Sequence, residues 1–205
     1  MTKLVDIIRS AKLAKRKKEK LLNTYTKIIF SCFLVLLASI THAQSVSYNF
    51  AEARYLNSDG GGDGIEIAGS YLVDPEWVVM GQFSTQEFDN DFDLDIYEIG
   101  VGYLLPEING YSLLASASFT HFNTDFDDDN GVRLAFGARN MFTDRIEGRA
   151  SINYVTAGGD NDLFFEVGGD YFFNPRLAAG AEIQLGSELD TVSIGVRWHY
   201  GYWNR

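Results

Sequence analysis

The sequence predicts an all-β fold, a closed antiparallel up-and-down transmembrane β-barrel preceded by a cleaved signal peptide. Three observations predict it. After residue 45 the chain repeats a unit of about ten residues with alternating polarity, followed by a turn. One face of these units is aliphatic with aromatic residues toward the ends, and the other face is charged. The charge of the chain is also divided between a basic beginning and an acidic remainder.

The first 43 residues have the pattern of a secretory signal peptide with a long basic leader. Nine of the 17 basic residues precede the apolar run 28–40, and Thr41-His42-Ala43 follows that run. A basic segment, an apolar run of about 7–15 residues and a small-x-small site are typical of cleaved signals. The run is also shorter than the roughly 20 residues of a membrane-spanning helix. We therefore expect a signal peptide over 1–43 and a barrel over 44–205.

The expected mature domain is acidic and has no cysteine. It carries eight basic residues, none of them lysine, and 26 acidic residues, which gives a net charge of −18. Such a charge repels phosphate backbones and argues against nucleic-acid binding. Cys32, the only cysteine, lies in the predicted signal, so the mature chain is expected to have no disulfide and no cysteine site.

Alternation with a period of two indicates β-strands, because successive side chains of a strand point to opposite faces. In the last unit, for example, Val192 and Ile194 alternate with Ser193 and Gly195. The pattern predicts about ten strands, with eight as the alternative. The expected ranges are 46–56, 64–72, 77–87, 94–105, 111–122, 132–142, 145–155, 162–172, 177–186 and 191–203.

The connections between these strands are expected to alternate in character. Four are tight turns, which together hold all three prolines, at 73–76, 106–110, 143–144 and 173–176. Five are acidic and mostly longer, at 57–63, 88–93, 123–131, 156–161 and 187–190. Short turns at one end and longer loops at the other are typical of outer-membrane barrels, with both termini in the periplasm.

The two faces of the strands favour a barrel in lipid over a soluble β-sandwich. Aromatic rings beside the tight turns suit a membrane interface, where the ring is half buried and its polar end stays wet. A closed barrel also leaves no unpaired strand edge in hydrocarbon. These aromatic residues are Tyr71, Trp77, Tyr103, Tyr111, Phe142, Tyr171, Trp198 and Tyr202.

Twelve charged side chains on the opposite face predict an ion-pair network in the lumen. A sandwich core could not hold them, whereas in a narrow barrel they should interdigitate and fill the interior. We expect a structural plug, and a narrow water path with a weak cation preference is the alternative. The twelve residues are Glu52, Arg54, Glu66, Glu98, Arg133, Arg139, Glu147, Arg149, Glu166, Asp170, Glu182 and Arg197.

The segment Tyr48–Trp77 resembles the first hairpin of small outer-membrane barrels of the OmpA/OmpX-like type, in its Gly- and Asp-bearing loop, Gly-Ser-Tyr strand and Pro turn. The resemblance continues through Glu98–Tyr103 (EIGVGY) and the final strand. It implies a surface protein of the outer membrane and a terminal aromatic residue that the barrel-assembly machinery reads. Here Trp203 is aromatic, but Asn204 and Arg205 follow it.

The sequence predicts no catalytic set and no cofactor site. His121 with Ser118 or Thr120 and Asp125 imitates the Ser-His-carboxylate set of outer-membrane lipid enzymes. The period-two alternation, however, places His121 on the outer face of the strand and both hydroxyls on the inner face. His199 is expected in the lumen near the other end. We therefore expect a protein that is not an enzyme, with a lipid-modifying enzyme as the least favoured alternative.

The acidic loops are the best candidates for a ligand. Alternating aspartates supply the oxygen atoms that Ca²⁺ and Mg²⁺ prefer, although no loop has the glutamate that closes a calcium loop. The candidate metal ligands are Asp125, Asp127 and Asp129 in one loop and Asp89, Asp91 and Asp93 in another.

The function predicted from the sequence is a structural or surface-interaction role for a monomeric outer-membrane barrel. A narrow passive, porin-like channel is the alternative. The expected partners are outer-membrane lipid, lipopolysaccharide and the barrel-assembly machinery.

Overall fold

The computed structural model describes residues 46–59, 61–88, 92–124, 128–186 and 190–200. The predicted signal peptide, residues 1–43, lies outside the described residues and stays a prediction. Within the described part of the chain, no helix is long and apolar enough to cross a membrane.

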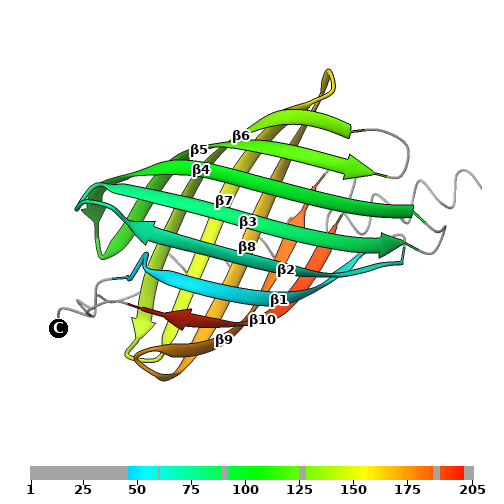
Figure 1. The fold of residues 1–205 in the computed structure, drawn as a ribbon. Coiled ribbons are helices and arrows are strands. Elements are labelled where there is room, and N and C mark those ends of the chain that lie inside the picture. Colours follow the sequence, from blue (N-terminus) through cyan, green and yellow to red (C-terminus); the bar gives the residue numbers. More distant parts are fainter. Residues whose placement is uncertain (1–45, 60, 89–91, 125–127, 187–189, 201–205) are drawn as a thin grey trace, which may run out of the picture. The chain divides into compact units, whose positions relative to one another are not determined.

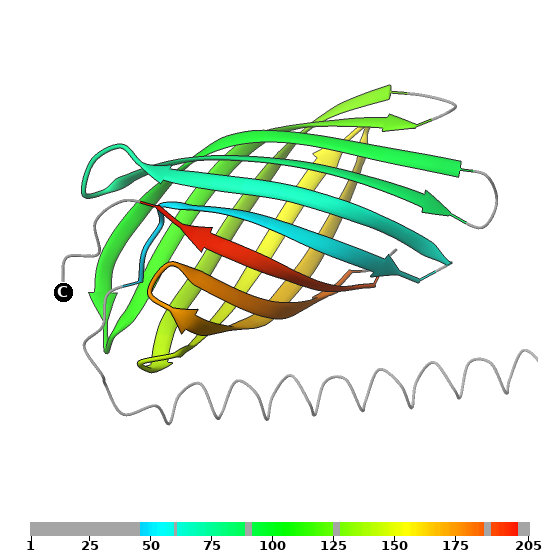
Figure 2. The same ribbon diagram turned by 60° about the horizontal axis from the view of Figure 1, so that its bottom comes forward.

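Ten antiparallel strands form one closed barrel (Figure 1). Each strand pairs with its neighbours in the chain, and β1 pairs with β10 to close the sheet (Figure 2). The predicted up-and-down barrel is confirmed, with ten strands and not eight. The strands are β1 (Phe50–Ser58), β2 (Gly62–Leu72), β3 (Trp77–Phe88), β4 (Phe92–Ile108), β5 (Tyr111–Thr124), β6 (Asp128–Thr143), β7 (Ile146–Ala157), β8 (Asp160–Asn174), β9 (Leu177–Leu185) and β10 (Thr191–His199).

Local sequence explains the tight turns at one end of the barrel. Asn109 and Gly110 join β4 to β5, and their φ angles of 53° and 81° are both left-handed. Two consecutive left-handed residues form a type I′ turn, whose twist matches that of the two strands it connects. In the β2–β3 turn, the Asp74 carboxylate accepts hydrogen bonds from the backbone N–H groups of Glu76 and Trp77, both at 2.8 Å. We call this end of the barrel the turn end and the opposite end the loop end.

The strands run further toward the loop end than the alternation predicts. Only residues 125–127 separate β5 from β6, where the sequence predicts a loop over 123–131. Gly158 and Gly159, with φ angles of 59° and 96°, connect β7 to β8 within the expected loop 156–161. The connections at the loop end are therefore nearly as short as the turns at the turn end, although the sequence predicts longer ones. Exposed acidic residues at a strand end do not interrupt its backbone pairing, so an acidic stretch was wrongly interpreted as loop.

Three of the tight turns also differ from the expected ranges, and the β8–β9 turn is confined to 175–176 because β8 continues to Asn174. The β6–β7 turn lies at 144–145 and not at 143–144, and β4 continues to Ile108 through the first part of 106–110. A register shift between Leu105 and Ile108 accommodates Pro106. Proline can occupy a strand at such an irregularity, where its missing N–H is not needed.

Both ends of the described chain lie at the turn end of the barrel. The Tyr200 N–H donates to the Asn49 carbonyl at 3.0 Å, and the His199 N–H donates to the Arg176 carbonyl in the β8–β9 turn at 2.7 Å. The two ends of the described chain therefore emerge at the same end of the barrel.

Candidate functional site: the barrel lumen

The outer face of the barrel is apolar along its middle. Ile67, Ile99, Ile194 and Val196 are between 54% and 69% exposed. A continuous apolar surface of this kind has to be covered to be stable in water. A closed sheet has no unpaired edge, which is the condition for strands in hydrocarbon. The outer face is therefore that of a transmembrane barrel.

Aromatic side chains border this apolar band at both ends. At the turn end, the rings of Trp77 and Tyr103 lie 5.1 Å apart. At the loop end, the Tyr97 ring lies 4.9 Å from Phe83 and 6.1 Å from His121. Tyr97 and Tyr103 are six residues apart on β4, about 20 Å at roughly 3.3 Å per residue. The alternation in the sequence already places Tyr97 and His121 on this outer face.

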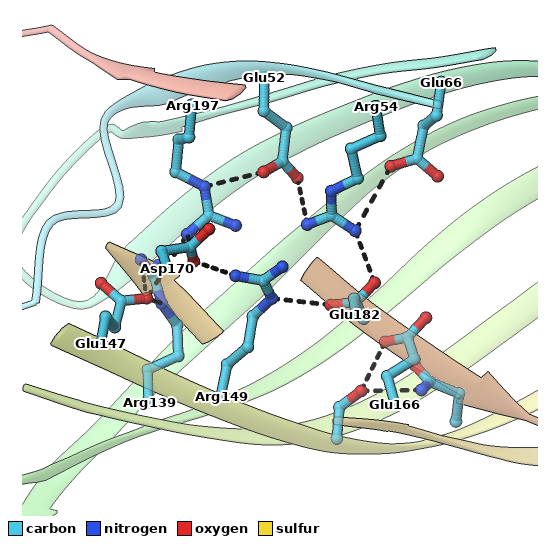
Figure 3. Close-up of polar contacts among 12 residues, drawn as sticks. Glu52, Arg54, Glu66, Arg139, Glu147, Arg149, Glu166, Asp170, Glu182 and Arg197 are labelled. Carbon is cyan, nitrogen blue, oxygen red and sulfur yellow. Dashed lines mark hydrogen bonds and ion pairs between the residues drawn. The ribbon is translucent and has the colours of Figure 1, made fainter. Parts of the chain in front are cut away.

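Eight of the predicted lumen residues form a cluster with equal numbers of acidic and basic side chains (Figure 3). At its centre Arg197, only 3% exposed, lies 2.8 Å from Glu52, 3.1 Å from Asp170 and 3.4 Å from Glu147. We call this group the balanced cluster. Its members are Glu52, Arg54, Arg139, Glu147, Arg149, Asp170, Glu182 and Arg197.

Glu182 of β9 links two arginines of the balanced cluster across the lumen. It accepts hydrogen bonds from Arg54 Nη1 at 2.5 Å and from Arg149 Nε at 2.7 Å. Arg149 also pairs with Asp170 on the adjacent strand β8. Such bonds from opposite walls hold the side chains in the interior, where buried ions need partners.

Three of the other four predicted residues form a second group around Arg133, and the fourth, Glu66, is placed with them here although its ion pair is with Arg54. The Arg133 guanidinium lies 3.2 Å from Glu98 and 2.8 Å from Glu166. Glu66 has its arginine contact with Arg54, at 3.7 Å. We call Glu66, Glu98, Arg133 and Glu166 the Arg133 cluster; it contains three carboxylates and one guanidinium.

The segment before β1 fills the lumen at the turn end. Tyr48 is 5% exposed, its hydroxyl lies 3.1 Å from the Ser112 hydroxyl on β5, and its carbonyl accepts a hydrogen bond from Ser70 on β2. Val46 packs against a buried group of Met141, Phe172 and Ala178. We call residues 46–49 the plug segment. The alternation of β1 continues into this segment and predicts a first strand over 46–56, whereas the strand begins only at Phe50.

Buried rings complete the closure at the turn end. His199 is fully buried, with its ring 5.8 Å from Phe50 and 5.3 Å from Phe172. The Arg139 guanidinium lies 4.7 Å from the Tyr48 ring centre. A cation over an aromatic face is favourable, and more so without water. The plug segment is therefore held by both ring contacts and a charge.

The hydroxyls and the histidine that imitate the Ser-His-carboxylate set of lipid enzymes do not lie together. The His121 Nδ1 lies 3.1 Å from Asn130 Oδ1 on the exposed outer side. Ser118 and Thr120 are 5% and 2% exposed and face the lumen. His121 is thus on the opposite face of the sheet from both hydroxyls.

Only two of the predicted metal ligands fall within the described residues. Asp129 lies against Gly158 of the β7–β8 turn, and Asp93 is the cross-strand neighbour of Glu87. Among the described residues, no group of three or more His, Cys, Asp or Glu side chains could hold a metal ion. Divalent-cation binding stays a prediction, because Asp89, Asp91, Asp125 and Asp127 lie outside the described residues.

A cavity of about 320 Å³ remains inside the lumen. The whole Arg133 cluster lines it, together with several members of the balanced cluster. Apolar side chains from β3, β4 and β5 line another part: Met80, Leu94, Ile96 and Leu114. The lumen can therefore hold water or a small molecule in a cavity that charged, polar and apolar side chains line together.

No family model and no curated protein matches this chain. Among solved structures, it is similar to the KdgM porin in complex with disordered oligogalacturonate, with 12% identity over 74% of this chain and 99% of that chain, and a TM-score of 0.49. A de novo designed transmembrane β-barrel is 11% identical over 77% and 99%, with a TM-score of 0.46. The Acinetobacter baumannii outer membrane protein Omp33 is 13% identical over 77% and 100%, with a TM-score of 0.40. These likenesses are distant, and the fold assignment rests on the strand pairing itself.

Proposed function

We propose that this protein is a monomeric outer-membrane β-barrel with a structural or surface-interaction role, and that its lumen is closed to ions. The apolar outer face between two aromatic borders supports a position across a lipid bilayer. The turn end, where both chain ends emerge, would face the periplasm, as chain ends do in barrels of bacterial outer membranes.

The observation that carries the proposal is the closure of the turn end. Tyr48 and Phe172 are 5% and 3% exposed, and Ala178 and His199 are fully buried. An ion that crossed the lumen would have to displace the plug segment and these rings. It would also have to pass the balanced cluster, in which every arginine is already paired with a carboxylate.

Planar-bilayer recording tests the closure. We expect no unitary conductance from the protein as it stands, because its lumen is filled. Tyr48→Ala should open the turn end and give measurable conductance steps. Tyr48→Phe, which keeps the ring and loses only the contact with Ser112, should stay closed. Steps from the unaltered protein would contradict the proposal, as would identical traces from the two variants.

A narrow passive channel is the second candidate, and the cavity of about 320 Å³ favours it. It would place water along part of the lumen and give a weak cation preference through the acidic excess. Swelling of liposomes in small neutral and charged solutes separates the two functions. A closed barrel gives the swelling rate of empty liposomes, whereas a channel admits small cations faster than anions.

Further partners of the proposed barrel follow from its surface. Outer-membrane lipid and lipopolysaccharide would cover the apolar face, and the barrel-assembly machinery would insert the chain. The acidic loop end would bind Ca²⁺ or Mg²⁺ weakly, as divalent ions do where anionic groups gather. We propose no catalytic activity, and the OmpA/OmpX-like resemblance stays part of this proposal.

A further inference from the structure

The cavity in the lumen follows strand β3 along most of its length. Five inward-facing side chains of this strand line it in succession, namely Val78, Met80, Gln82, Ser84 and Gln86. Together they span about 26 Å at roughly 3.3 Å per residue. A volume of about 320 Å³ spread over that length leaves only a narrow bore. The shape of the cavity therefore suits a thin, extended molecule better than a compact one.

The charges in the cavity lining compensate one another. The lining contains five arginines and five glutamates. Each of these arginines is paired with a carboxylate, and each glutamate has an arginine nitrogen within 3.7 Å. A charged ligand would lose its hydration on entry and would find no opposite charge without a partner. The lining therefore favours an uncharged ligand.

Two buried hydroxyl groups in the lining are open to such a ligand. Ser84 and Ser193 are 2% and 4% exposed, and both line the cavity. Within the part of the chain that the structure describes, neither hydroxyl makes a hydrogen bond to the protein. Their direct cross-strand neighbours, Ile96 and Leu56, are apolar and line the cavity as well. Since buried polar groups are nearly always hydrogen-bonded, the cavity calls for a molecule that has both a hydroxyl group and a hydrocarbon part.

We propose that the cavity binds a linear aliphatic alcohol, with its hydroxyl group bonded to Ser84 and its alkyl chain against Ile96 and Met80. A hydroxyl group both donates and accepts, so it satisfies the serine without introducing a charge. Water alone would leave these apolar side chains in contact with solvent, whereas an alkyl chain removes them from it. Because the plug segment fills the turn end, the ligand enters from the loop end. The proposal is independent of whether the lumen conducts.

Calorimetric titration of the refolded protein in detergent with 1-pentanol tests the site, with the same detergent without protein as the blank. Two temperatures are used, because burial of apolar surface makes the heat of binding depend on temperature. We expect saturable binding with a dissociation constant of roughly millimolar size, which is within reach of so small a ligand. Each methylene added between 1-propanol and 1-pentanol should tighten binding about fourfold.

Comparison titrants test the shape and the charge of the ligand separately. The compact isomer 2,2-dimethylpropan-1-ol has the same atoms and the same primary hydroxyl group, but it should not fit the narrow bore and should bind about tenfold more weakly or not at all. Sodium pentanoate and pentylammonium chloride keep the linear chain and carry opposite charges. Both should also bind about tenfold more weakly than 1-pentanol, because they would have to be desolvated beside ion pairs that are already complete.

Three variants of neighbouring residues on β3 locate the binding. Ser84→Phe fills the bore and should abolish binding of 1-pentanol. Thr85→Phe adds the same ring on the opposite face of the strand and should leave the affinity unchanged. Ser84→Ala keeps the bore and removes only the hydroxyl group, so it should weaken binding about fivefold. Heat-modifiable migration on gels checks that each variant is folded.

Several results would overturn the site. Absence of saturable heat from the folded protein at both temperatures means that the cavity holds water only. Equal affinity for 1-pentanol and its compact isomer, or equal binding by Ser84→Phe and Thr85→Phe, shows partition into the detergent and not a site. Binding of pentylammonium or pentanoate as tight as that of 1-pentanol contradicts the uncharged ligand. None of these results depends on the bilayer recordings that test the closed lumen.

Discussion

Arg197 illustrates how an ion can be stable inside this barrel. It is 3% exposed, yet Glu52, Glu147 and Asp170 surround it within 3.4 Å. Removing one partner of such a buried group leaves a charge without compensation, which costs more than the pair itself contributes. Single substitutions in the lumen should therefore be far more harmful than paired ones.

Arg139→Met tests this at a residue with one close carboxylate. Its Nε donates to Glu147 Oε1 at 2.8 Å, and Glu147 is 1% exposed. We expect the free energy of unfolding to fall by about 3 kcal/mol, measured by urea titration of the barrel in phospholipid vesicles. The double variant with Glu147→Gln should recover part of that loss.

The matched control for Arg139→Met is Arg176→Met in the exposed β8–β9 turn. This variant loses the same charge, but from a side chain exposed to water, so the free energy of unfolding should change by less than about 0.5 kcal/mol. Equal losses in the two single variants would mean that the lumen ion pairs do not stabilise the barrel.

At the scale of the strand, period-two alternation was sufficient to place the elements and their faces. Val192 and Ile194 lie outside and Ser193 inside, because parity is fixed once one residue of a strand is placed. The ends of the strands were not predictable in the same way. Asp128 and Asp160 are the first residues of β6 and β8, since an exposed acid at a strand end is compatible with pairing.

The lumen contacts were predictable only in part. Parity alone puts the twelve charges on one face, but it does not say which pairs form, because pairing across the lumen depends on the barrel's closure and stagger. The division into a balanced cluster and an acidic Arg133 cluster is therefore visible only in the structure. The same holds for the plug segment, whose fold into the turn end the alternation of residues 46–49 does not reveal.

The β4–β5 turn gives a prediction at the scale of the element. Gly110 has a φ of 81°, a region that β-branched residues rarely adopt. Gly110→Val should lower the free energy of unfolding by about 1–3 kcal/mol, measured as a shift of the urea midpoint. In the control variant Asn109→Gly, the new residue also tolerates the left-handed region, so the urea midpoint should stay nearly unchanged. A Gly110→Val protein as stable as the original would mean that this turn does not adopt the described conformation.

At the scale of the whole molecule, charge is arranged by position along the barrel. The described basic residues lie in the lumen or in the turns of the turn end, as Arg145 and Arg176 do. The outer rim at the loop end carries carboxylates such as Asp63, which accepts hydrogen bonds from Tyr55 and Asn57, both at 2.7 Å. An acidic rim of this kind should attract divalent cations.

Calcium should therefore stabilise the refolded barrel slightly. At a concentration equal to the dissociation constant, binding adds about 0.4 kcal/mol, which calorimetry records as a small upward shift of the unfolding temperature. Sodium at the same ionic strength controls for screening. No binding heat and no shift at millimolar Ca²⁺ would end the hypothesis for the acidic loops.

The central claim is that each strand has one face in hydrocarbon and one in an ion-lined interior. Spin labels attached to Val192→Cys, Ser193→Cys and Ile194→Cys, each in a Cys32→Ser background, test it most directly in lipid vesicles. Val192 and Ile194 are 51% and 59% exposed, whereas Ser193 is 4% exposed. We predict high collision rates with oxygen, which concentrates in lipid, at positions 192 and 194, and a low rate at 193. Strong exposure of 192 and 194 to a water-soluble nickel relaxant would contradict the transmembrane barrel.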